Sequence, residues 1–433
     1  MEIPILIVFL IGYLLIALEH PLKIDKAASA LLTGVICWTL YALSDSAAHV
    51  NEVLLRHLSE IAGILFFLLG AMTIVELVDA HDGFAVIIDK IRTRNKVKLL
   101  WLIGVVTFFL SAVLDNLTTS IVMISLLKKM IQERDTRWLY AGVVVIAANA
   151  GGAWSPIGDV TTTMLWIKGQ LPHSLEIIKA VIIPSLVCMI VPILFLSLDL
   201  KGEIKPPRLQ DGVDYATSVC NVFERHLVFL TGLIGLLLVP AFKAITHLPP
   251  FMGMMLSLSI IWMITEFIHR RKPLEEKGPL SVLAVLRRID TASILFFLGI
   301  LLAVSTLEET GLLGGAASAF DRAFTGEYSV YMINMMIGFL SAIVDNVPLV
   351  AAAQGMYPVT TGGGPFAPGG IFWLFLAYCA GTGGSALIIG SAAGIAVMGL
   401  ERMDFIWYLR KITLLSVTGY LAGAVVFILM SSM

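Results

Sequence analysis

Long apolar stretches separated by short polar segments make up almost the whole chain. Ten of these stretches are long enough to cross a hydrocarbon layer of roughly 30 Å as α-helices. The pattern therefore predicts an all-α polytopic membrane protein. The expected spans, two of them interrupted by glycines, are Ile3–Leu18, Ala27–Leu43, Ile61–Val78, Ala141–Lys168, Ile177–Leu198, Leu227–Phe242, Phe251–Ile268, Ala292–Leu307, Ile371–Leu400 and Ile406–Leu429.

A short polar motif occurs twice within this apolar background. The hexapeptide SAVLDN at 111–116 returns as SAIVDN at 341–346, 230 positions later, and ILFFLL at 64–69 matches ILFFLG at 294–299 at the same offset. Three matches in the same order predict a duplicated unit. The third and looser match, at an offset of 232, pairs Gly151, Gly152 and Gly158 with Gly383, Gly384 and Gly390.

Each polar motif lies near the middle of a further apolar stretch, at 99–130 and at 330–356. Both flanks of the first stretch are rich in Lys and Arg, whereas the flanks of the second contain only Arg322. By the positive-inside rule, both ends of the first stretch belong on the cytoplasmic face and both ends of the second belong outside. Each stretch is therefore expected to enter the membrane and return to the same side as a re-entrant hairpin.

With a hairpin in each unit, five membrane crossings remain per unit, so the second unit is inserted upside down. Inverted repeats are typical of secondary transporters, whose substrate sites lie near the midplane at the repeat interface. Both chain termini then lie outside, as do five basic residues: Arg56, Lys168, Lys179, Lys243 and Arg322. The expected units are a first repeat at 1–200 with a hairpin tip at 115–119 and a broken helix at 141–168, a cytoplasmic linker at 201–224, and a second repeat at 225–433 with a hairpin tip at 345–348 and a broken helix at 371–400.

Composition agrees with a membrane protein. The 433 residues are 58% hydrophobic and 14% charged, whereas the charged fraction of a soluble globular domain is about a quarter. The net charge of −2 gives no reason to expect a nucleic-acid partner. The amino terminus lacks the basic segment and cleavage site of a signal peptide, so the first span is expected to be retained. The four cysteines show no C-x-x-C pairing, so we expect neither disulfides nor a cysteine metal site, and no cofactor.

Oxygen-bearing side chains gather at the two hairpin tips and the two glycine-rich breaks. A carboxylate at membrane depth costs roughly 2.5 to 3.5 kcal/mol on insertion scales, so a repeated one indicates a function. Hairpin tips and broken helices also offer backbone oxygens, and hard oxygen ligands suit a small cation. No Lys or Arg accompanies these side chains, which argues against an anionic substrate. The candidate ion-binding and proton-coupling residues are Asp115, Asn116, Thr118, Asn149, Ser155, Asp159, Asp345, Asn346, Thr382, Ser385 and Ser391, and those expected to hold Na⁺ directly are Asp115, Asn116, Asn149, Asp345 and Asn346.

The same residues also have a purely structural interpretation. Asp115, Asp159 and Asp345 can act as N-caps of the helices that follow them. Glycine-rich stretches in membrane helices commonly serve close packing. Repetition of the carboxylate at membrane depth favours ion binding, and a capping residue can also bind an ion.

For ionisable side chains elsewhere in the chain, the sequence provides less support for a functional interpretation. Glu76 lies near the end of its span, where it is either an ordinary interfacial charge or an accessory acid. Four histidines stand beside loops, and we expect them to be solvated: His20, His81, His247 and His269.

The motifs SAVLDNLTT, SAIVDNVP, ANAGGAWSPIGD and GTGGSALIIGSAAG resemble those of the NhaD-type sodium/proton antiporters of the ion transporter superfamily. The resemblance covers nearly the whole chain. It implies electrogenic or pH-activated exchange of Na⁺ or Li⁺ for H⁺, a homodimer and an elevator-like movement of the hairpin domain. The family is bacterial, with relatives in chloroplast envelopes, and the unprefixed amino terminus favours a bacterial inner membrane. By motif position it assigns function to Asp115, Asn116, Asn149 and Asp159, and to Asp345, Asn346 and the hydroxyls between Gly381 and Ser391.

The resulting hypothesis is that Na⁺ and H⁺ compete for the same buried aspartates, and that only a loaded site moves between the two faces. An arsenite or organic-anion transporter on the same scaffold is the alternative. The dicarboxylate branch of the superfamily typically has neutral hairpin tips, whereas both tips are acidic in this chain. No Ser/His/Asp or metal-ligand cluster in the sequence supports an enzyme.

Overall fold

The described part of the chain is helical. The computed structural model describes residues 2–44, 47–88, 91, 93–204 and 220–432, and no β-strand occurs among them. The expectation of an all-helical fold is confirmed for these residues. Most of the predicted linker at 201–224 lies outside them.

The helices of the first half begin near the amino terminus and end before that linker. They are α1 (Glu2–Ala17), α2 (Glu19–Leu22), α3 (Lys26–Ala42), α4 (Ala47–Ala80), α5 (Ala85–Ile88), α6 (Lys96–Leu114), α7 (Asn116–Met130), α8 (Arg134–Ala153), α9 (Val160–Ile167) and α10 (Ser174–Asp199).

The helices of the second half follow from residue 222 onward. They are α11 (Val222–Thr246), α12 (Pro250–Ile268), the 3₁₀ turn η1 (His269–Arg271), α13 (Leu274–Leu280), α14 (Val282–Leu286), α15 (Thr291–Glu309), α16 (Leu312–Ala323), α17 (Ser329–Leu340), α18 (Asn346–Met356), α19 (Ile371–Gly383), α20 (Ala392–Glu401), α21 (Phe405–Lys411) and α22 (Thr413–Ser431).

Many of these helices are long and apolar enough to cross a membrane. Seven in the described residues meet that criterion: α4, α6, α10, α11, α12, α15 and α22. Five more apolar helices are shorter, including α1 and α3. The chain is therefore a multi-pass integral membrane protein.

One predicted span is wrong in its extent. The stretch Ile406–Leu429 is divided, because α21 ends at Lys411 and α22 begins at Thr413. The side chain of Ile412 packs against Gly142 of α8, in the space that a Cβ at that glycine would fill. A count of apolar residues cannot detect this division, because Ile412 is itself apolar.

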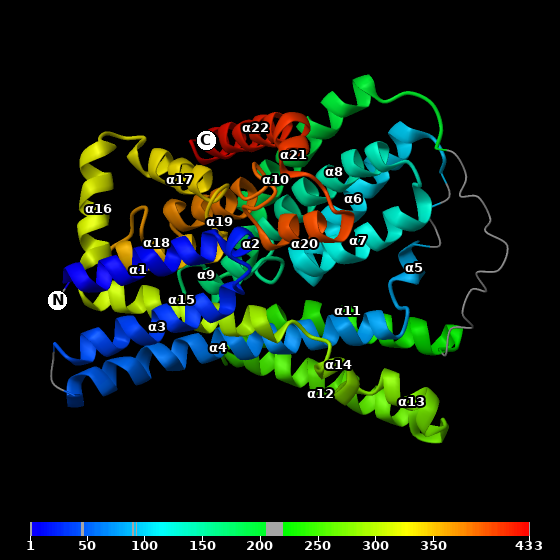
Figure 1. The fold of residues 1–433 in the computed structure, drawn as a ribbon, viewed down its shortest axis with the longest axis horizontal. Coiled ribbons are helices and arrows are strands. Elements are labelled where there is room, and N and C mark those ends of the chain that lie inside the picture. Colours follow the sequence, from blue (N-terminus) through cyan, green and yellow to red (C-terminus); the bar gives the residue numbers. More distant parts are fainter. Residues whose placement is uncertain (1, 45–46, 89–90, 92, 205–219, 433) are drawn as a thin grey trace.

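The helices are arranged in two layers (Figure 1). The lower layer comprises α1, α3, α4, α11, α12 and α15, which contact one another. The upper layer comprises α6 to α8, α10, α17 and α19 to α22. Two short helices, α9 and α18, contact each other, and they also contact α4 and α15, respectively, of the lower layer. The first helix break, directly before α9, and the second hairpin tip, directly before α18, therefore lie between the layers.

The same backbone contacts occur in both halves of the chain. Ser111 Oγ donates a hydrogen bond to the carbonyl oxygen of Ala148 at 2.6 Å, and Ser341 Oγ donates to that of Ala380 at 2.9 Å. A Cβ on Gly151 would overlap the carbonyl of Phe108, and one on Gly383 would overlap that of Gly338. Each pair holds a hairpin against a broken helix, at positions that match by the sequence offsets.

Candidate ion-binding site

Asp115 connects the two helices of the first hairpin. It stands between α6 and α7 with φ of 73°, in the left-handed region that side chains rarely adopt. Its Oδ1 accepts a hydrogen bond from the backbone N–H of Thr118 at 2.8 Å, and its Oδ2 accepts one from the Thr118 hydroxyl at 2.8 Å. Both carboxylate oxygens are thus satisfied by the first turn of α7.

Asp345 has the corresponding place in the second hairpin, directly before α18. Its Oδ1 accepts a hydrogen bond from the backbone N–H of Val347 at 3.2 Å. Its Oδ2 lies 3.7 Å from Nζ of Lys26, the first residue of α3. This carboxylate is therefore paired with a cation from the lower layer.

Asp159 is the most enclosed of the three aspartates, with 2% of its surface exposed. It caps α9, because its Oδ1 accepts a hydrogen bond from the backbone N–H of Thr161 at 3.0 Å. Its Oδ2 accepts hydrogen bonds from Asn116 Nδ2 at 3.0 Å and from Asn346 Nδ2 at 3.3 Å. One carboxylate oxygen thus receives an amide from each hairpin tip.

Asn149, at the end of α8, extends this network to the second broken helix. Its Oδ1 accepts a hydrogen bond from Asn116 at 3.1 Å. Its Nδ2 donates to Ser385 Oγ and to Ser391 Oγ, each at 2.9 Å. Asn149 is fully buried, so its amide connects the two halves away from solvent.

A small cavity of about 60 Å³ lies beside these groups. By volume it has room for a few water molecules or one partly hydrated monovalent cation. All three aspartates line it, as do both hairpin asparagines, Thr118 and Lys26. Asp115 and Asp345, which are 230 positions apart in the chain, therefore face one space.

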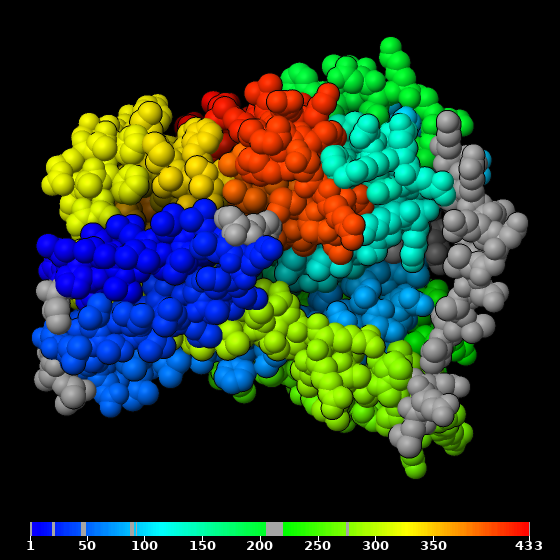
Figure 2. All heavy atoms as spheres, viewed as in Figure 1, coloured from blue at the N-terminus to red at the C-terminus, as the bar shows by residue number. Residues whose placement is uncertain are grey.

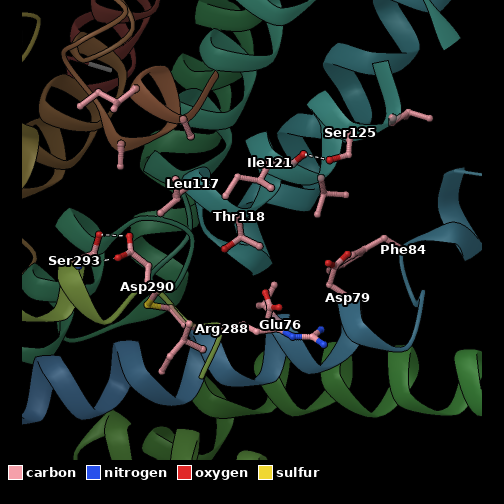
Figure 3. Close-up of a pocket in the computed structure, with 18 of the residues that line it drawn as sticks. Glu76, Asp79, Phe84, Leu117, Thr118, Ile121, Ser125, Arg288, Asp290 and Ser293 are labelled. Atoms are coloured by element: carbon pink, nitrogen blue, oxygen red, sulfur yellow. Dashed lines mark hydrogen bonds between the residues drawn. The ribbon is translucent and has the colours of Figure 1, made fainter. Parts of the chain in front are cut away.

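A larger cavity of about 1100 Å³, which we call the vestibule, adjoins the small one. The two share six lining residues: Lys26, Met72, Leu117, Thr118, Ser293 and Ala392. Figure 3 shows Thr118 of α7 on one side of the vestibule and Glu76 and Asp79 of α4 on the other. Figure 2 shows the surface hollowed between α7 and the segment after α14. The vestibule therefore reaches the wall of the small cavity.

Six of the candidate residues do not line the small cavity. Asn149, which was expected to hold Na⁺ directly, is connected to it through its hydrogen bond with Asn116, and Ser385 and Ser391 only through Asn149. The other three are Ser155, Thr382 and Glu76. Ser155 Oγ accepts a hydrogen bond from the backbone N–H of Ile157 at 3.4 Å, within its own loop. The Thr382 hydroxyl donates to the carbonyl of Tyr378 at 2.6 Å, one helical turn earlier. Glu76 lines the vestibule and not the small cavity.

The expectation that no Lys or Arg accompanies these side chains is wrong, because Lys26 lines the cavity and faces Asp345. Lysine at the start of an apolar stretch is common at membrane interfaces, so its position alone gave no signal. Its partner lies 319 residues further along, and a single sequence does not reveal such a contact.

The histidine expectation is correct for one residue and wrong for two. His247 is exposed, whereas His81 and His269 are buried and their Nε2 atoms lie 2.8 Å apart. His81 Nδ1 also contacts the carbonyl of Leu77 at 2.7 Å. The pair connects the end of α4 to the turn after α12, and the side chain of His20 lies outside the described residues.

The chemistry of the pocket is that of oxygen ligands. Among the residues that the structure describes, no three or more His, Cys, Asp and Glu side chains converge as a metal cluster. A cation in the small cavity would therefore combine a carboxylate with amide, hydroxyl or backbone oxygens. Such a mixed oxygen set suits an ion that is bound and released.

Comparison with known proteins gives consistent results. The family model described as "Citrate transporter" (CitMHS) matches residues 2–375. "Sodium/proton antiporter 1" of Arabidopsis thaliana is 47% identical over 98% of this chain and 71% of its own length. "Sodium/proton antiporter 2" of the same plant is 44% identical, with 98% of each chain covered. "Na(+)/H(+) antiporter NhaD" of Vibrio cholerae is 31% identical over 98% of this chain and 91% of its own.

Proposed function

Because the chain belongs to the NhaD-type sodium/proton antiporter family, within the group matched by the citrate transporter model, we propose that it exchanges Na⁺, and also Li⁺, for H⁺ across a membrane. It is a transporter and not an enzyme. The main support for the exchanged ions is the environment of Asp159. This buried carboxylate receives one amide from each hairpin and faces a cavity of about 60 Å³.

Competition for the aspartates couples the two ions. Asp115, Asp159 and Asp345 face one cavity, so a bound cation and bound protons neutralise the same negative charge. Lys26 offsets one of the carboxylate charges, and carboxylates left uncompensated are costly at membrane depth, so the pocket holds either Na⁺ or protons when it crosses. Exchange follows if only these neutralised forms move between the faces.

Inverted repeats explain why residues from both halves of the chain line one pocket. In support, the Ser111 and Ser341 hydrogen bonds match by the sequence offset, and so do the close approaches of Gly151 and Gly383. The duplication brings two hairpins and two broken helices together at one site. We infer that the hairpins are re-entrant and enter from opposite faces.

An elevator movement fits the division of the pocket between the layers. Asn116, Asn149, Asp159, Asn346 and the two serines belong to the upper layer or to the short helices and loops attached to it. Glu76 and Lys26 belong to α4 and α3 of the lower layer. The upper layer, if it moves together with α9 and α18, can thus carry nearly the complete ligand set while the lower layer stays in place. The contacts of α9 with α4 and of α18 with α15 then have to break or slide.

The vestibule indicates which face the site communicates with in this conformation. Its outer part includes Lys129, Arg225 and Arg288, which lie in segments that the positive-inside rule assigns to the cytoplasm. We infer an inward-facing state. A bacterial cytoplasmic membrane, termini outside and a homodimer remain our predictions, and two of the relatives named above come from a plant.

The first experiment measures dye quenching in proteoliposomes on addition of Na⁺, Li⁺ or K⁺. Asp115→Asn and Asp345→Asn should each abolish Na⁺-dependent proton movement. Asp404→Asn is the matched control, because Asp404 also caps a helix, accepting from the Trp407 N–H at 2.9 Å, but lies outside both cavities. Full exchange in either pocket variant would refute the assigned role.

Organic-anion transport is the second candidate, favoured by the description of the family model and by the ammonium of Lys26. Three carboxylates around a cavity of about 60 Å³ oppose it, since a polycarboxylate meets both repulsion and a lack of space. Uptake of labelled citrate, or arsenite movement, by the same proteoliposomes distinguishes the candidates. A rate of citrate or arsenite transport that does not depend on Na⁺ or pH supports the second candidate.

A further inference from the structure

The two hairpin aspartates are held differently although they match in the repeat. Thr118 supplies both an N–H and a hydroxyl to Asp115. The position that matches Thr118 is occupied by Pro348, which has neither group. The Oδ2 of Asp345 therefore lacks the donor that its counterpart has, and the ammonium of Lys26 lies on that side instead.

Lys26 stands at the boundary between the layers. Its Nζ lies 4.6 Å from the centre of the Phe296 ring on α15, so it rests between an aromatic face and a carboxylate. The side chains of Lys26 and Asp345 are only 19% and 14% exposed. The cation is thus held by the lower layer and directed at the tip of the second hairpin.

The contact between Lys26 and Asp345 is suited to being broken. Charge-assisted N–H···O hydrogen bonds are about 2.7 to 2.9 Å long, whereas this pair is 3.7 Å apart. The lysine stem is flexible, and the ammonium lines the vestibule as well as the small cavity. Glu19 lines the same vestibule, and its Oε1 accepts a hydrogen bond from the backbone N–H of Lys26 at 3.4 Å, so a second carboxylate lies close to the displaced ammonium.

We propose that Lys26 is a tethered cation that competes with Na⁺ for Asp345. This inference rests on the proposed exchange function and adds a residue that sets the apparent affinity for Na⁺. In the empty pocket the ammonium offsets one of three carboxylate charges. When Na⁺ binds at Asp345, the ammonium moves toward Glu19, and when Na⁺ leaves, it returns.

The test compares the KM for Na⁺ of wild type, Lys26→Met and Lys26→Arg in proteoliposomes at one pH. Methionine removes the competitor at similar size, so the KM should fall about fivefold, or roughly 1 kcal/mol. Arginine binds carboxylates bidentately and should raise the KM. A merely structural role of Lys26 does not predict opposite shifts. An unchanged or raised KM in Lys26→Met overturns the proposal.

A second variant changes the hydrogen-bond donors that are available to the same carboxylate, that of Asp345. Pro348→Thr gives Asp345 the N–H and hydroxyl that Asp115 has, so it should loosen Lys26 and lower the KM for Na⁺. Added to Lys26→Met, it should have no further effect. Equilibrium binding of ²²Na⁺ to the purified protein, which involves no transport, should rank the variants by Na⁺ affinity in the same order.

The two proposals fail in different ways. If wild type shows no Na⁺-dependent proton movement, the exchange function itself is wrong. If wild type exchanges the ions but Lys26→Met and Pro348→Thr leave Na⁺ affinity unchanged, only the role of Lys26 is wrong.

Discussion

Asn346 donates a hydrogen bond to Asp159 at 3.3 Å, so the second hairpin contacts the first broken helix directly. Asp159 Oδ2 also accepts from Asn116 at 3.0 Å. These two amides belong to matching positions of the repeated motif. Asp159 matches a serine, Ser391, in the second half of the chain, and yet its carboxylate accepts an amide from both hairpins.

Asp159→Asn should abolish Na⁺-dependent proton movement and Na⁺ binding, because an uncharged amide can neither balance a cation nor exchange a proton. Its oxygen can still accept from a neighbouring amide, so folding should lose only about 1 kcal/mol per hydrogen bond. Dye quenching and ²²Na⁺ binding measure the first effect, and thermal melting in detergent measures the second. Asp404→Asn is again the matched control. Retained Na⁺ binding in Asp159→Asn would show that Asp115 and Asp345 hold the ion without Asp159.

Much of the site could be predicted from local sequence, and the rest depends on contacts between the halves. Asp115 and Asp345 were identifiable because the motif repeats within apolar surroundings, and the structure places both on one cavity. Lys26 was not identifiable, since its importance comes from packing of α3 beside the second hairpin. The difference between Thr118 and Pro348 is visible in the aligned motifs, but only the hydrogen bonds in the structure show that it leaves one oxygen of Asp345 without the donor that Asp115 has.

The fold, too, could be predicted where it depends on local sequence and not where it depends on contacts between distant segments. Apolar length identified most helices, but not the end of α21 at Lys411, which follows from the packing of Ile412 on Gly142. The buried pair His81 and His269 was also missed, because each histidine lies at the end of an apolar helix where solvation is the ordinary outcome.

Gly151→Ala and Gly383→Ala should each destabilise the protein. A Cβ at either position overlaps a carbonyl of the neighbouring hairpin helix, and the backbone must move to relieve it. The expected loss is about 1 to 3 kcal/mol or more, seen as a lower melting temperature in detergent. The control is Gly315→Ala in α16, where a Cβ meets nothing within 4 Å. That change should be neutral or stabilise by up to about 1 kcal/mol. Equal effects at all three glycines would contradict the packing role.

The buried histidine pair should make the folded state less stable in acid. Burial is the main cause that lowers the pKa of His81, and Lys272 adds to it while Glu224 opposes it. The unfolded chain binds a proton below about pH 6.5, whereas the folded chain resists it, so stability falls as the pH falls. The melting temperature should drop between pH 7.5 and pH 5.

The double variant His81→Phe, His269→Leu should reduce that drop, since no imidazole remains to be protonated. His247→Leu serves as its control because His247 is exposed, and it should keep the wild-type pH dependence. An identical acid sensitivity in the double variant would show that other groups are responsible.

The amide of Asn149 also limits how this protein can be divided into fragments. Both of its N–H groups are used by Ser385 and Ser391, more than 230 residues away. A fragment ending near residue 200 would retain that buried amide with neither acceptor, at a penalty of about 1 to 3 kcal/mol for each unpaired donor. Although its two halves share repeated motifs, the chain should not be separable into independently stable halves, and co-expressed fragments should survive only together.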